Sequence, residues 1–232
     1  MKLIRIILIT VLFSVLFQSC APTYMPNVLS NPDLRQSGDI TISGYYGSAG
    51  VDIKTSFAVS NHVGILLGGN FDHSDGDVSH SHGFFEVGGG YFDKKTPHFS
   101  WAVYGGVGTG NYNTTIRIRA PYADGIYKTQ YEVVRYFLQP SATYHSQIGE
   151  IGLACRMDAL HVSGTQDIGP AHCLDHTFPM IEPSLNIKVG KGNWRIALQG
   201  GFSIHLANES LHYLPGIIAM GVQLKLNAKP KK

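Results

Sequence analysis

The chain has 232 residues, of which 44% are hydrophobic, 11% aromatic and 15% charged. This composition excludes a disordered polyelectrolyte, because there is enough apolar material to bury a core. The 18 Lys and Arg residues are balanced by 16 Asp and Glu residues, which leaves no basic field for binding nucleic acid. The 27 glycines and the aromatic content are typical of turn-rich β proteins.

Residues 1–19 predict an export signal rather than part of the fold. Lys2 and Arg5 precede an apolar run at residues 6–17, which is short for a membrane-spanning helix. A serine stands directly before Cys20 after this run, a pattern typical of a lipoprotein signal, in which the cysteine is diacylated and becomes the new N-terminus. We therefore predict lipidation at Cys20. The alternative is an ordinary signal peptide with an incidental cysteine.

The next residues, 20–38, hold three of the eleven prolines and show no hydrophobic periodicity. We interpret them as a lipidated, extended tether, followed by one barrel domain at residues 39–227 and a basic tail at residues 228–232. An exported chain meets oxidising conditions, so Cys155 and Cys173 could pair. Against such a bridge, we expect Cys155 to face lipid within a strand and Cys173 to lie in a loop.

Ten segments of alternating apolar and polar residues follow, separated by Gly, Asn, Asp and Pro. Their lengths, near ten residues, suit tilted membrane-spanning strands. The predicted fold is an all-β, antiparallel up-and-down transmembrane β-barrel of about ten strands, with eight as the alternative number. We expect strands at residues 39–46, 50–59, 62–72, 83–92, 100–112, 131–145, 150–163, 180–189, 193–205 and 215–226.

The segments have one apolar face and one face that carries charge. In the ninth segment, Trp194, Ile196 and Leu198 share one face, while Arg195 and Gln199 share the other. A small barrel with an apolar outer band and a polar interior produces this pattern. The interior charges would have to pair, because a lone buried charge is costly. We assign the following charged residues to the lumen: Asp52, Lys54, Glu86, Arg135, Arg156, Asp158, Glu182, Lys188 and Arg195.

The predicted connections alternate between short and long. Outer-membrane barrels pair short periplasmic turns with long external loops in this way. The connection at residues 47–49 is short where a long loop is expected. The short connections are 60–61, 93–99, 146–149 and 190–192, and the long ones are 73–82, 113–130, 164–179 and 206–214.

Two stretches resemble small outer-membrane β-barrel lipoproteins of the Bacteroidetes group: SCAPTYMPN at residues 19–27, with GDI at 38–40, and the hairpin FAVSNHVG at 57–64. The resemblance covers the signal and the first hairpin closely and the remainder in architecture. It implies a cell outer membrane location, anchored through acyl chains such as palmitate on Cys20, with outer-membrane lipids as partners. It supplies no catalytic residues. The residues after Cys20 lack the acidic run that resembles a surface-export signal in this group, so we expect the lipid in the inner leaflet.

The densest cluster of metal-ligating residue types is the predicted loop DHSDGDVSHSH at residues 72–82. Imidazole and carboxylate groups together can bind a divalent metal. The spacing matches no zinc motif, and the oxygen ligands do not follow the EF-hand pattern. We therefore interpret the loop as solvated and assign no metal and no cofactor.

A catalytic hypothesis starts from His161 and Ser163, which lie two positions apart on one strand face. This arrangement resembles outer-membrane lipid A deacylases, which use a His, a Ser and an acid, and Asp167 or Glu182 could supply the acid. A match of this size arises by chance, so we assign no catalytic residue. The glycine-rich stretch at residues 105–110 lies within a predicted strand, whereas a phosphate-binding loop needs a helix N-terminus there.

These observations predict a lipid-anchored outer-membrane barrel with a structural or surface-interaction role, no catalysis, and a surface ligand or envelope protein as partner. Three alternatives stay open. The first is a narrow pore for ions or small solutes. The second is the lipid-modifying hydrolase, and the third is a soluble periplasmic β-barrel tethered by Cys20 alone.

Overall fold

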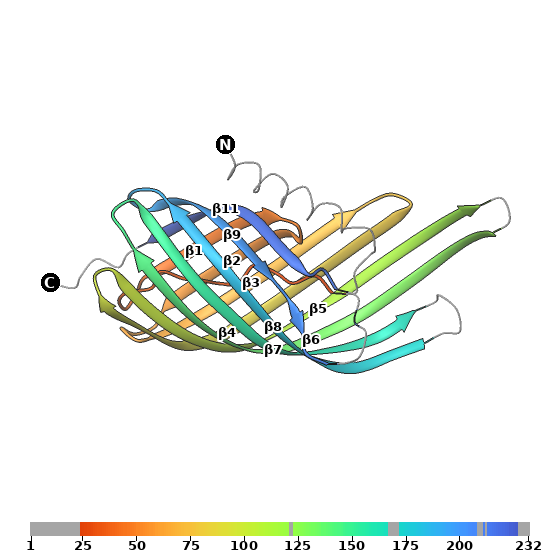
Figure 1. Cartoon of the computed structure of the whole chain (residues 1–232), viewed down its shortest axis with the longest axis horizontal. Coiled ribbons are helices and arrows are strands. Elements are labelled where there is room, and N and C mark those ends of the chain that lie inside the picture. Colours follow the sequence, from red (N-terminus) through yellow and green to blue (C-terminus); the bar gives the residue numbers. More distant parts are fainter. Residues whose placement is uncertain (1–23, 121–122, 167–171, 208–210, 212, 227–232) are drawn as a thin grey trace, which may run out of the picture.

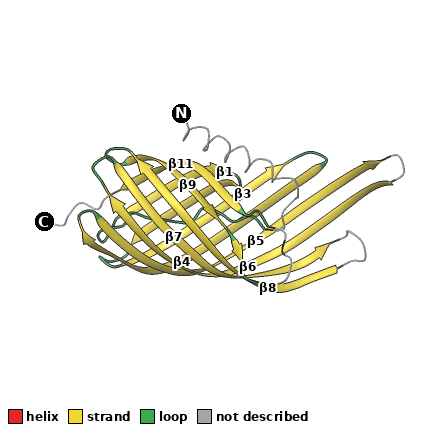
Figure 2. Ribbon diagram, in the orientation of Figure 1, coloured by secondary structure: helices red, strands yellow, loops and turns green. Residues whose placement is uncertain are grey.

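The computed structural model describes residues 24–120, 123–166, 172–207, 211 and 213–226. These residues form one antiparallel β-barrel (Figures 1 and 2). None of them forms a helix of the length and hydrophobicity that a membrane crossing requires. The strands are β1 (Ile40–Gly47), β2 (Gly50–Ala58), β3 (Val63–Ser74), β4 (Val78–Thr96), β5 (Phe99–Ala120), β6 (Ala123–His145), β7 (Gly149–Gln166), β8 (His172–Val189), β9 (Trp194–Phe202), β10 (Ile204–His205) and β11 (Gly216–Leu226).

Strands β1 to β9 pair with their neighbours in sequence, and β11 pairs with β9. The barrel closes where β1 pairs with β11 from Ile40↔Leu226 to Gly47↔Ala219. The short strand β10 continues the line of β9 after Ser203, and both pair with β8. The wall therefore consists of ten strand positions, as the sequence predicts. The predicted fold class is confirmed.

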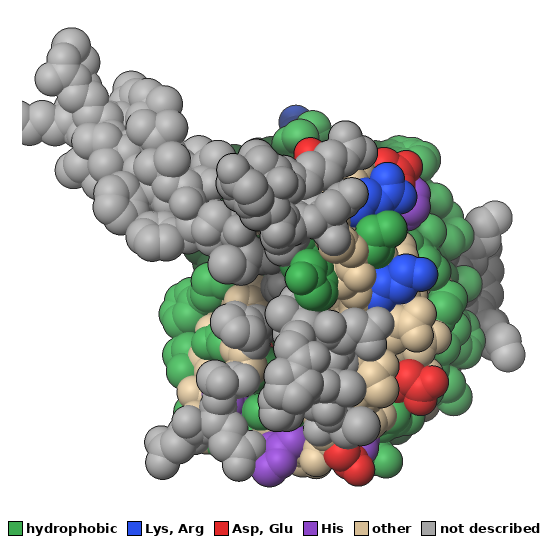
Figure 3. Space-filling model, turned by 90° about the vertical axis from the view of Figure 1, so that its right-hand side faces the viewer, with side chains coloured by type: hydrophobic (Ala, Val, Ile, Leu, Met, Phe, Trp, Pro, Cys, Tyr) green, Lys and Arg blue, Asp and Glu red, His purple; other side chains and the backbone are tan. Residues whose placement is uncertain are grey.

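The two ends of the barrel differ. Short turns join β2 to β3, β4 to β5, β6 to β7 and β8 to β9 at one end, which we call the turn end and which lies at the left of Figure 1. The opposite end carries hairpins that extend well beyond the rest of the wall, and we call it the hairpin end. Viewed from the hairpin end, apolar side chains cover the flanks of the barrel, and polar and charged ones gather across the end (Figure 3).

The strand alternation separates an apolar outer surface from a polar interior. Outward-facing apolar side chains on all ten wall positions remain exposed, for example Leu153 at 63% and Met220 at 65%. We call this surface the outer belt. Its members include Ile42, Ile53, Leu67, Val87, Val107, Leu138, Leu153, Leu185, Leu198 and Val222.

An arginine in the outer belt should therefore destabilise the barrel in lipid. We expect Leu198→Arg to cost about 2–4 kcal/mol when the protein folds into lipid vesicles, as cations do near the midplane of a bilayer. Asn111→Arg, which is exposed on β5 beyond the belt, should change little. Urea titration of the folded fraction in vesicles measures both. Equal midpoints for the two variants would contradict a membrane-embedded belt.

Three of the four predicted long loops, at residues 73–82, 113–130 and 164–179, are largely strand in the described residues. Residues 78–82 belong to β4, residues 113–120 to β5 and residues 123–130 to β6, and the ladder between β5 and β6 continues to Ala120↔Ala123. Similarly, β7 and β8 stay paired to Gln166↔His172. Apart from Ile126, the outward side chains described in the β5–β6 hairpin beyond the belt are polar, so the apolar outer band ends while backbone pairing continues. This is why the sequence pattern underestimates the length of these strands.

Residues 24–38 do not form a free tether. They lie inside the barrel, and we call them the luminal segment. Its main chain begins at the hairpin end, where Leu214 N donates to Tyr24 O at 3.0 Å, and it reaches the turn end, where Gly38 N donates to Ala58 O at 2.8 Å. The lumen of a ten-strand barrel needs more than wall side chains to fill it, and this segment supplies the missing material.

Candidate functional site

The luminal segment is held by three apolar clusters that follow one another along the barrel. Tyr24 packs in the first, with Phe84 and Tyr112 among its members. Val28 packs in the second, and Leu34 in the third. All three side chains of the segment are at most 3% exposed. The segment therefore acts as part of the core, with apolar anchors at its beginning, middle and end.

Lumen-facing glycines make room for the segment. A Cβ atom at Gly152 would lie 2.1 Å from Asn31 Nδ2, and one at Gly64 would lie 2.8 Å from Leu34 Cδ1. Side chains at these two positions would collide with the segment. The glycines of β3 and β7 thus fit an occupied lumen.

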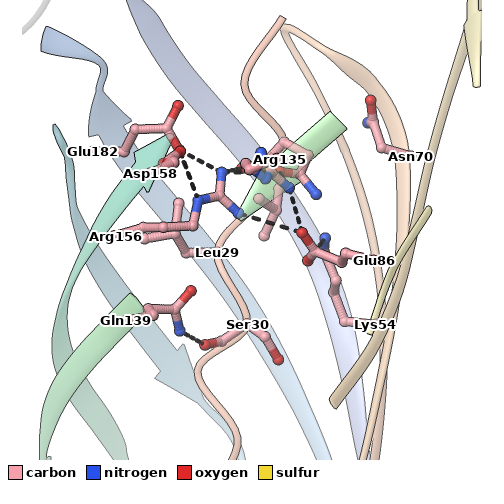
Figure 4. A network of polar contacts seen from close by, with 12 residues as sticks. Leu29, Ser30, Lys54, Asn70, Glu86, Arg135, Gln139, Arg156, Asp158 and Glu182 are labelled. Atoms are coloured by element: carbon pink, nitrogen blue, oxygen red, sulfur yellow. Dashed lines mark hydrogen bonds and ion pairs between the residues drawn. The ribbon is translucent and has the colours of Figure 1, made fainter. Parts of the chain in front are cut away.

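Wall side chains also bind the main chain of the segment. Gln199 accepts from Leu29 N at 2.8 Å and donates to Leu29 O at 3.1 Å. Gln139 Nε2 donates to Ser30 O at 2.6 Å (Figure 4), and Lys188 Nζ donates to Asn31 O at 2.5 Å. At Leu29, Ser30 and Asn31, main-chain groups that would be costly to bury alone thus find partners within the barrel.

A buried ionic network surrounds the middle of the segment (Figure 4). Glu86 is paired with Arg135 and accepts from Lys54 Nζ at 2.7 Å. Arg156 is paired with Glu182 through Nη2 and also donates from Nε at 2.8 Å. Each of these buried charged side chains therefore has an oppositely charged partner, which offsets the cost of removing it from water.

Asn27 joins this network to the segment. Its Oδ1 accepts from Arg135 Nη2 at 2.9 Å and from Arg156 Nη2 at 2.9 Å. Tyr24 OH accepts from Arg135 Nη1 at 2.8 Å and donates to Glu182 Oε1 at 3.3 Å. The wall charges are thus used to hold the segment in place.

A second ionic cluster forms around Asp33 at the turn end. Its carboxylate accepts from Arg35 Nε at 2.7 Å and from Lys225 Nζ at 2.5 Å, and Arg195 Nη1 lies 3.4 Å away. Burial of the carboxyl raises its pKa, but the charges of Lys225 and Arg35 outweigh this and lower the pKa of Asp33 from 3.8 to about 2.

This shift gives a pH dependence. A carboxyl whose pKa is lower in the folded state stabilises the fold above the unfolded pKa, and this contribution is lost as the pH falls through the folded pKa. We expect Asp33→Asn to lower the urea midpoint at about pH 5, and the difference from wild type to shrink as the pH falls from about 4 towards 2. A difference that stays constant over this range would contradict the ionised, paired state of Asp33.

The nine charged residues assigned to the lumen all lie there in the structure. Eight are buried, and Arg195 is half-buried at the turn end. Asp52 lies 3.4 Å from Lys54, and Asp158 lies 3.5 Å from Arg156. Sequence reasoning missed their partners on the luminal segment, and also Glu150 and Lys225 in the wall. The lumen-facing glycines were the available signal that something else occupies the interior.

The 72–82 segment differs from the solvated loop that the sequence suggests. Only residues 75–77 turn, and His80 and His82 point into the barrel, each 6% exposed. His73, by contrast, is exposed and lies 3.3 Å from Asp75. Three histidines of one hairpin are thus divided between two environments.

Of the two acids in the catalytic hypothesis, the structure places Glu182 away from His161. Glu182 faces the lumen with Arg156, whereas His161 is half-buried on the outer face of β7 and lies 3.4 Å from Asp175. Asp167 lies outside the described residues. Glu182 therefore cannot serve as the acid for His161, and Ser163 gains no partner from it.

The two remaining cysteines are far apart. Cys155 is a free thiol opposite Pro183, and Cys173 is opposite Thr165 in the same ladder. Ten residues separate Cys155 from Thr165, which is about 33 Å at 3.3 Å per residue. A disulfide needs Cα atoms within about 7 Å. Cys155 and Cys173 therefore do not pair, and Cys173 lies in β8 rather than in a loop.

No protein-family model matches the chain, and no curated protein resembles it in sequence. Its structure is similar to that of the outer membrane protease OmpT from Escherichia coli, with a TM-score of 0.58 over 86% of this chain and 99% of that one. It also resembles the translocator domain of the autotransporter NalP from Neisseria meningitidis, with a TM-score of 0.51 over 84% of this chain and 90% of that domain. The chain has the fold of outer-membrane β-barrel proteins. Sequence identities of 9% and 10% carry the likeness no further than the fold.

Proposed function

We propose that this chain is an outer-membrane barrel closed by its own luminal segment, with a structural role in the envelope and a contact surface at the hairpin end. The observation that carries the proposal is the filled lumen. Buried apolar anchors and charge-assisted hydrogen bonds hold residues 24–38 along the length of the barrel. A barrel closed in this way supports neither a constitutive pore nor a catalytic pocket in the lumen.

The exposed outer belt favours a membrane protein over a soluble periplasmic barrel. A soluble barrel would place exposed apolar side chains from all ten wall positions in water. Contiguous exposed apolar patches on soluble monomeric proteins rarely exceed a few hundred Å². The hairpins, whose outward side chains become polar beyond the belt, supply the surface that meets a ligand or an envelope protein.

Planar-bilayer recording tests the closed state. The purified full chain, folded as shown by a change in gel mobility on boiling, should give no discrete conductance steps. Regular steps from folded wild-type protein would overturn the proposal in favour of the narrow pore.

Labelling of intact cells tests the location and orientation. An epitope inserted between Ala120 and Ala123 lies at the tip of the longest hairpin, and one inserted in the 146–148 turn lies at the opposite end. We expect antibody to reach the first in intact cells and the second only after permeabilisation. Labelling of neither site, or only of the second, in intact cells would contradict the proposed orientation.

Lipid anchoring at Cys20, which lies outside the described residues, is part of the proposal. Tyr24 forms a bridge with Tyr213 at the hairpin end, and a chain of four residues reaches at most about 14 Å, which bounds the distance of Cys20 from Tyr24. This favours the leaflet on the hairpin side, which we propose is the outer leaflet, in place of the inner leaflet that the sequence suggests. Radiolabelled palmitate should enter wild type but not Cys20→Ala, and the variant should still resist carbonate extraction because the belt retains it. Extraction of the variant would support the soluble barrel.

A further inference from the structure

Three metal-ligating side chains meet inside the wall at the hairpin end. Asp72 of β3 lies opposite His82 of β4, and His80 lies two residues before His82 on the same face of β4. Each residue offers one ligand atom, and these atoms all lie within 4.8 Å of one another. Both imidazoles are buried, while Asp72 is half-buried. The outward neighbours Ser79 and Ser81 are polar, so the cluster lies beyond the apolar belt.

The hydrogen bonds of His82 fix which of its nitrogens is free. Its Nε2 lies 2.5 Å from Asn70 Oδ1. Asn70 Nδ2 donates to Ala49 O at 2.8 Å and to Asp52 Oδ2 at 3.0 Å, which sets the orientation of the amide. Asn70 Oδ1 must therefore accept from His82 Nε2–H. This leaves the lone pair of His82 on Nδ1, which points into the cluster.

His80 is arranged in the complementary way. Its Nδ1 lies 3.0 Å from Thr114 Oγ1, and its Nε2 lies 2.9 Å from His82 Nδ1. Each histidine therefore uses one nitrogen for a polar partner in the wall and turns the other toward the same point. Metal-binding histidines show this pattern, in which an outer partner orients the ring and sets its tautomer.

We propose that Asp72, His80 and His82 form a binding site for a divalent transition metal such as Zn²⁺. Two imidazoles and a carboxylate are a ligand set that zinc accepts, with a fourth position left for water or another ligand. Zn–N bonds of about 2.0–2.1 Å place two nitrogens roughly 3.3 Å apart on a tetrahedral ion. The imidazoles therefore need to separate by only a few tenths of an ångström.

Metal binding can occur without either imidazole ring releasing a proton to solvent. Without metal, His80 Nε2–H donates to His82 Nδ1, and Thr114 Oγ1–H donates to His80 Nδ1. With metal, the His80 proton moves to Nδ1 and is donated to Thr114 Oγ1, so that both inward nitrogens present lone pairs. The hydroxyl of Thr114 can take either role.

The other cluster of this type carries no such proposal. Asp33, His145 and Glu150 also place ligand atoms within 4.8 Å of one another. The positive charges of Arg35, Arg195 and Lys225 already occupy that region. No comparable cation is paired with Asp72, His80 or His82 among the described residues.

Isothermal calorimetry with Zn²⁺ on the full chain, purified without a histidine tag and folded in detergent, tests the site. We expect one Zn²⁺ per chain, loss of binding in His82→Ala and in the milder His80→Gln, and no heat with Mg²⁺. Thr114→Val should weaken binding by about 10–100-fold, as loss of an outer partner does.

The matched control is His73→Ala, which removes the exposed histidine of the same hairpin. It should bind Zn²⁺ as wild type does. The gel-mobility change on boiling confirms folding of each variant. Absence of Zn²⁺ binding by folded wild type would overturn the proposal. So would loss of binding in His73→Ala, or unchanged binding in folded His82→Ala or His80→Gln, because either would indicate adventitious binding elsewhere.

Discussion

Replacement of Glu86 by Gln is expected to lower the free energy of unfolding by about 3–5 kcal/mol, the usual cost of removing one partner from a buried ion pair. Glu86 is the shared carboxylate of Lys54, Arg135 and Arg156, and all four side chains lie inside the barrel. The isosteric glutamine keeps the volume but leaves three cations with one carboxylate fewer. Urea titration of the folded fraction, read from gel mobility without boiling, measures the change.

Asp75→Asn is the matched control, because this carboxylate is 84% exposed at the hairpin end and exposed pairs contribute little. It should shift the midpoint by less than about 1 kcal/mol. The double variant Glu86→Gln with Lys54→Met should recover part of the loss by removing one of the three cations that Glu86 neutralises, while Asp52 keeps its hydrogen bond from Asn70. A midpoint for Glu86→Gln equal to that of Asp75→Asn would show that the network does not stabilise the fold.

Displacement of the luminal segment is expected to convert a silent barrel into a conducting one. A valine at Gly152 would overlap with Asn31, since even a Cβ atom there lies 2.1 Å from Asn31 Nδ2. Deletion of residues 24–31 removes two of the three apolar anchors and the Asn27 contacts to both arginines. Folded protein of either variant should give discrete conductance steps in planar bilayers, the deletion more often than the point variant.

Gly200→Val is the control for the glycine substitution, because a Cβ atom at Gly200 meets nothing within 4 Å. It should remain silent, as wild type should. Silent behaviour of the folded deletion variant would contradict the role of the luminal segment in closing the barrel.

The sequence predicts the wall of the barrel better than its contents. The alternation of β9, with Trp194 and Leu198 outside and Gln199 inside, identifies both the strand and its faces. That information is local, because the face on which a side chain lies depends only on its position along its own strand. The extension of β5 and β6 was missed because the outward residues of this hairpin are mostly polar, as at Asn113, Arg117 and Lys128, which is the composition expected of an external loop.

The luminal segment was missed for a different reason. Its residues show no period, since their order follows the irregular interior that they fill rather than a helix or a strand. Tyr24 and Asn27 are bound by Arg135, and Asp33 by Lys225, across more than 100 residues of sequence. For the same reason, the inward position of His80 and His82 follows from the β3–β4 pairing and not from their spacing.

The position of the luminal segment constrains the order in which the barrel can be assembled. The segment directly precedes β1, and β1 and β11 form the seam that closes the wall. Its main chain is bonded to Gln139 on β6, Lys188 on β8 and Gln199 on β9. We expect the luminal segment to be enclosed when the strands assemble around it and the β1–β11 pairing forms last. In this order of assembly, residues 24–38 would act as an internal template around which the later strands are placed.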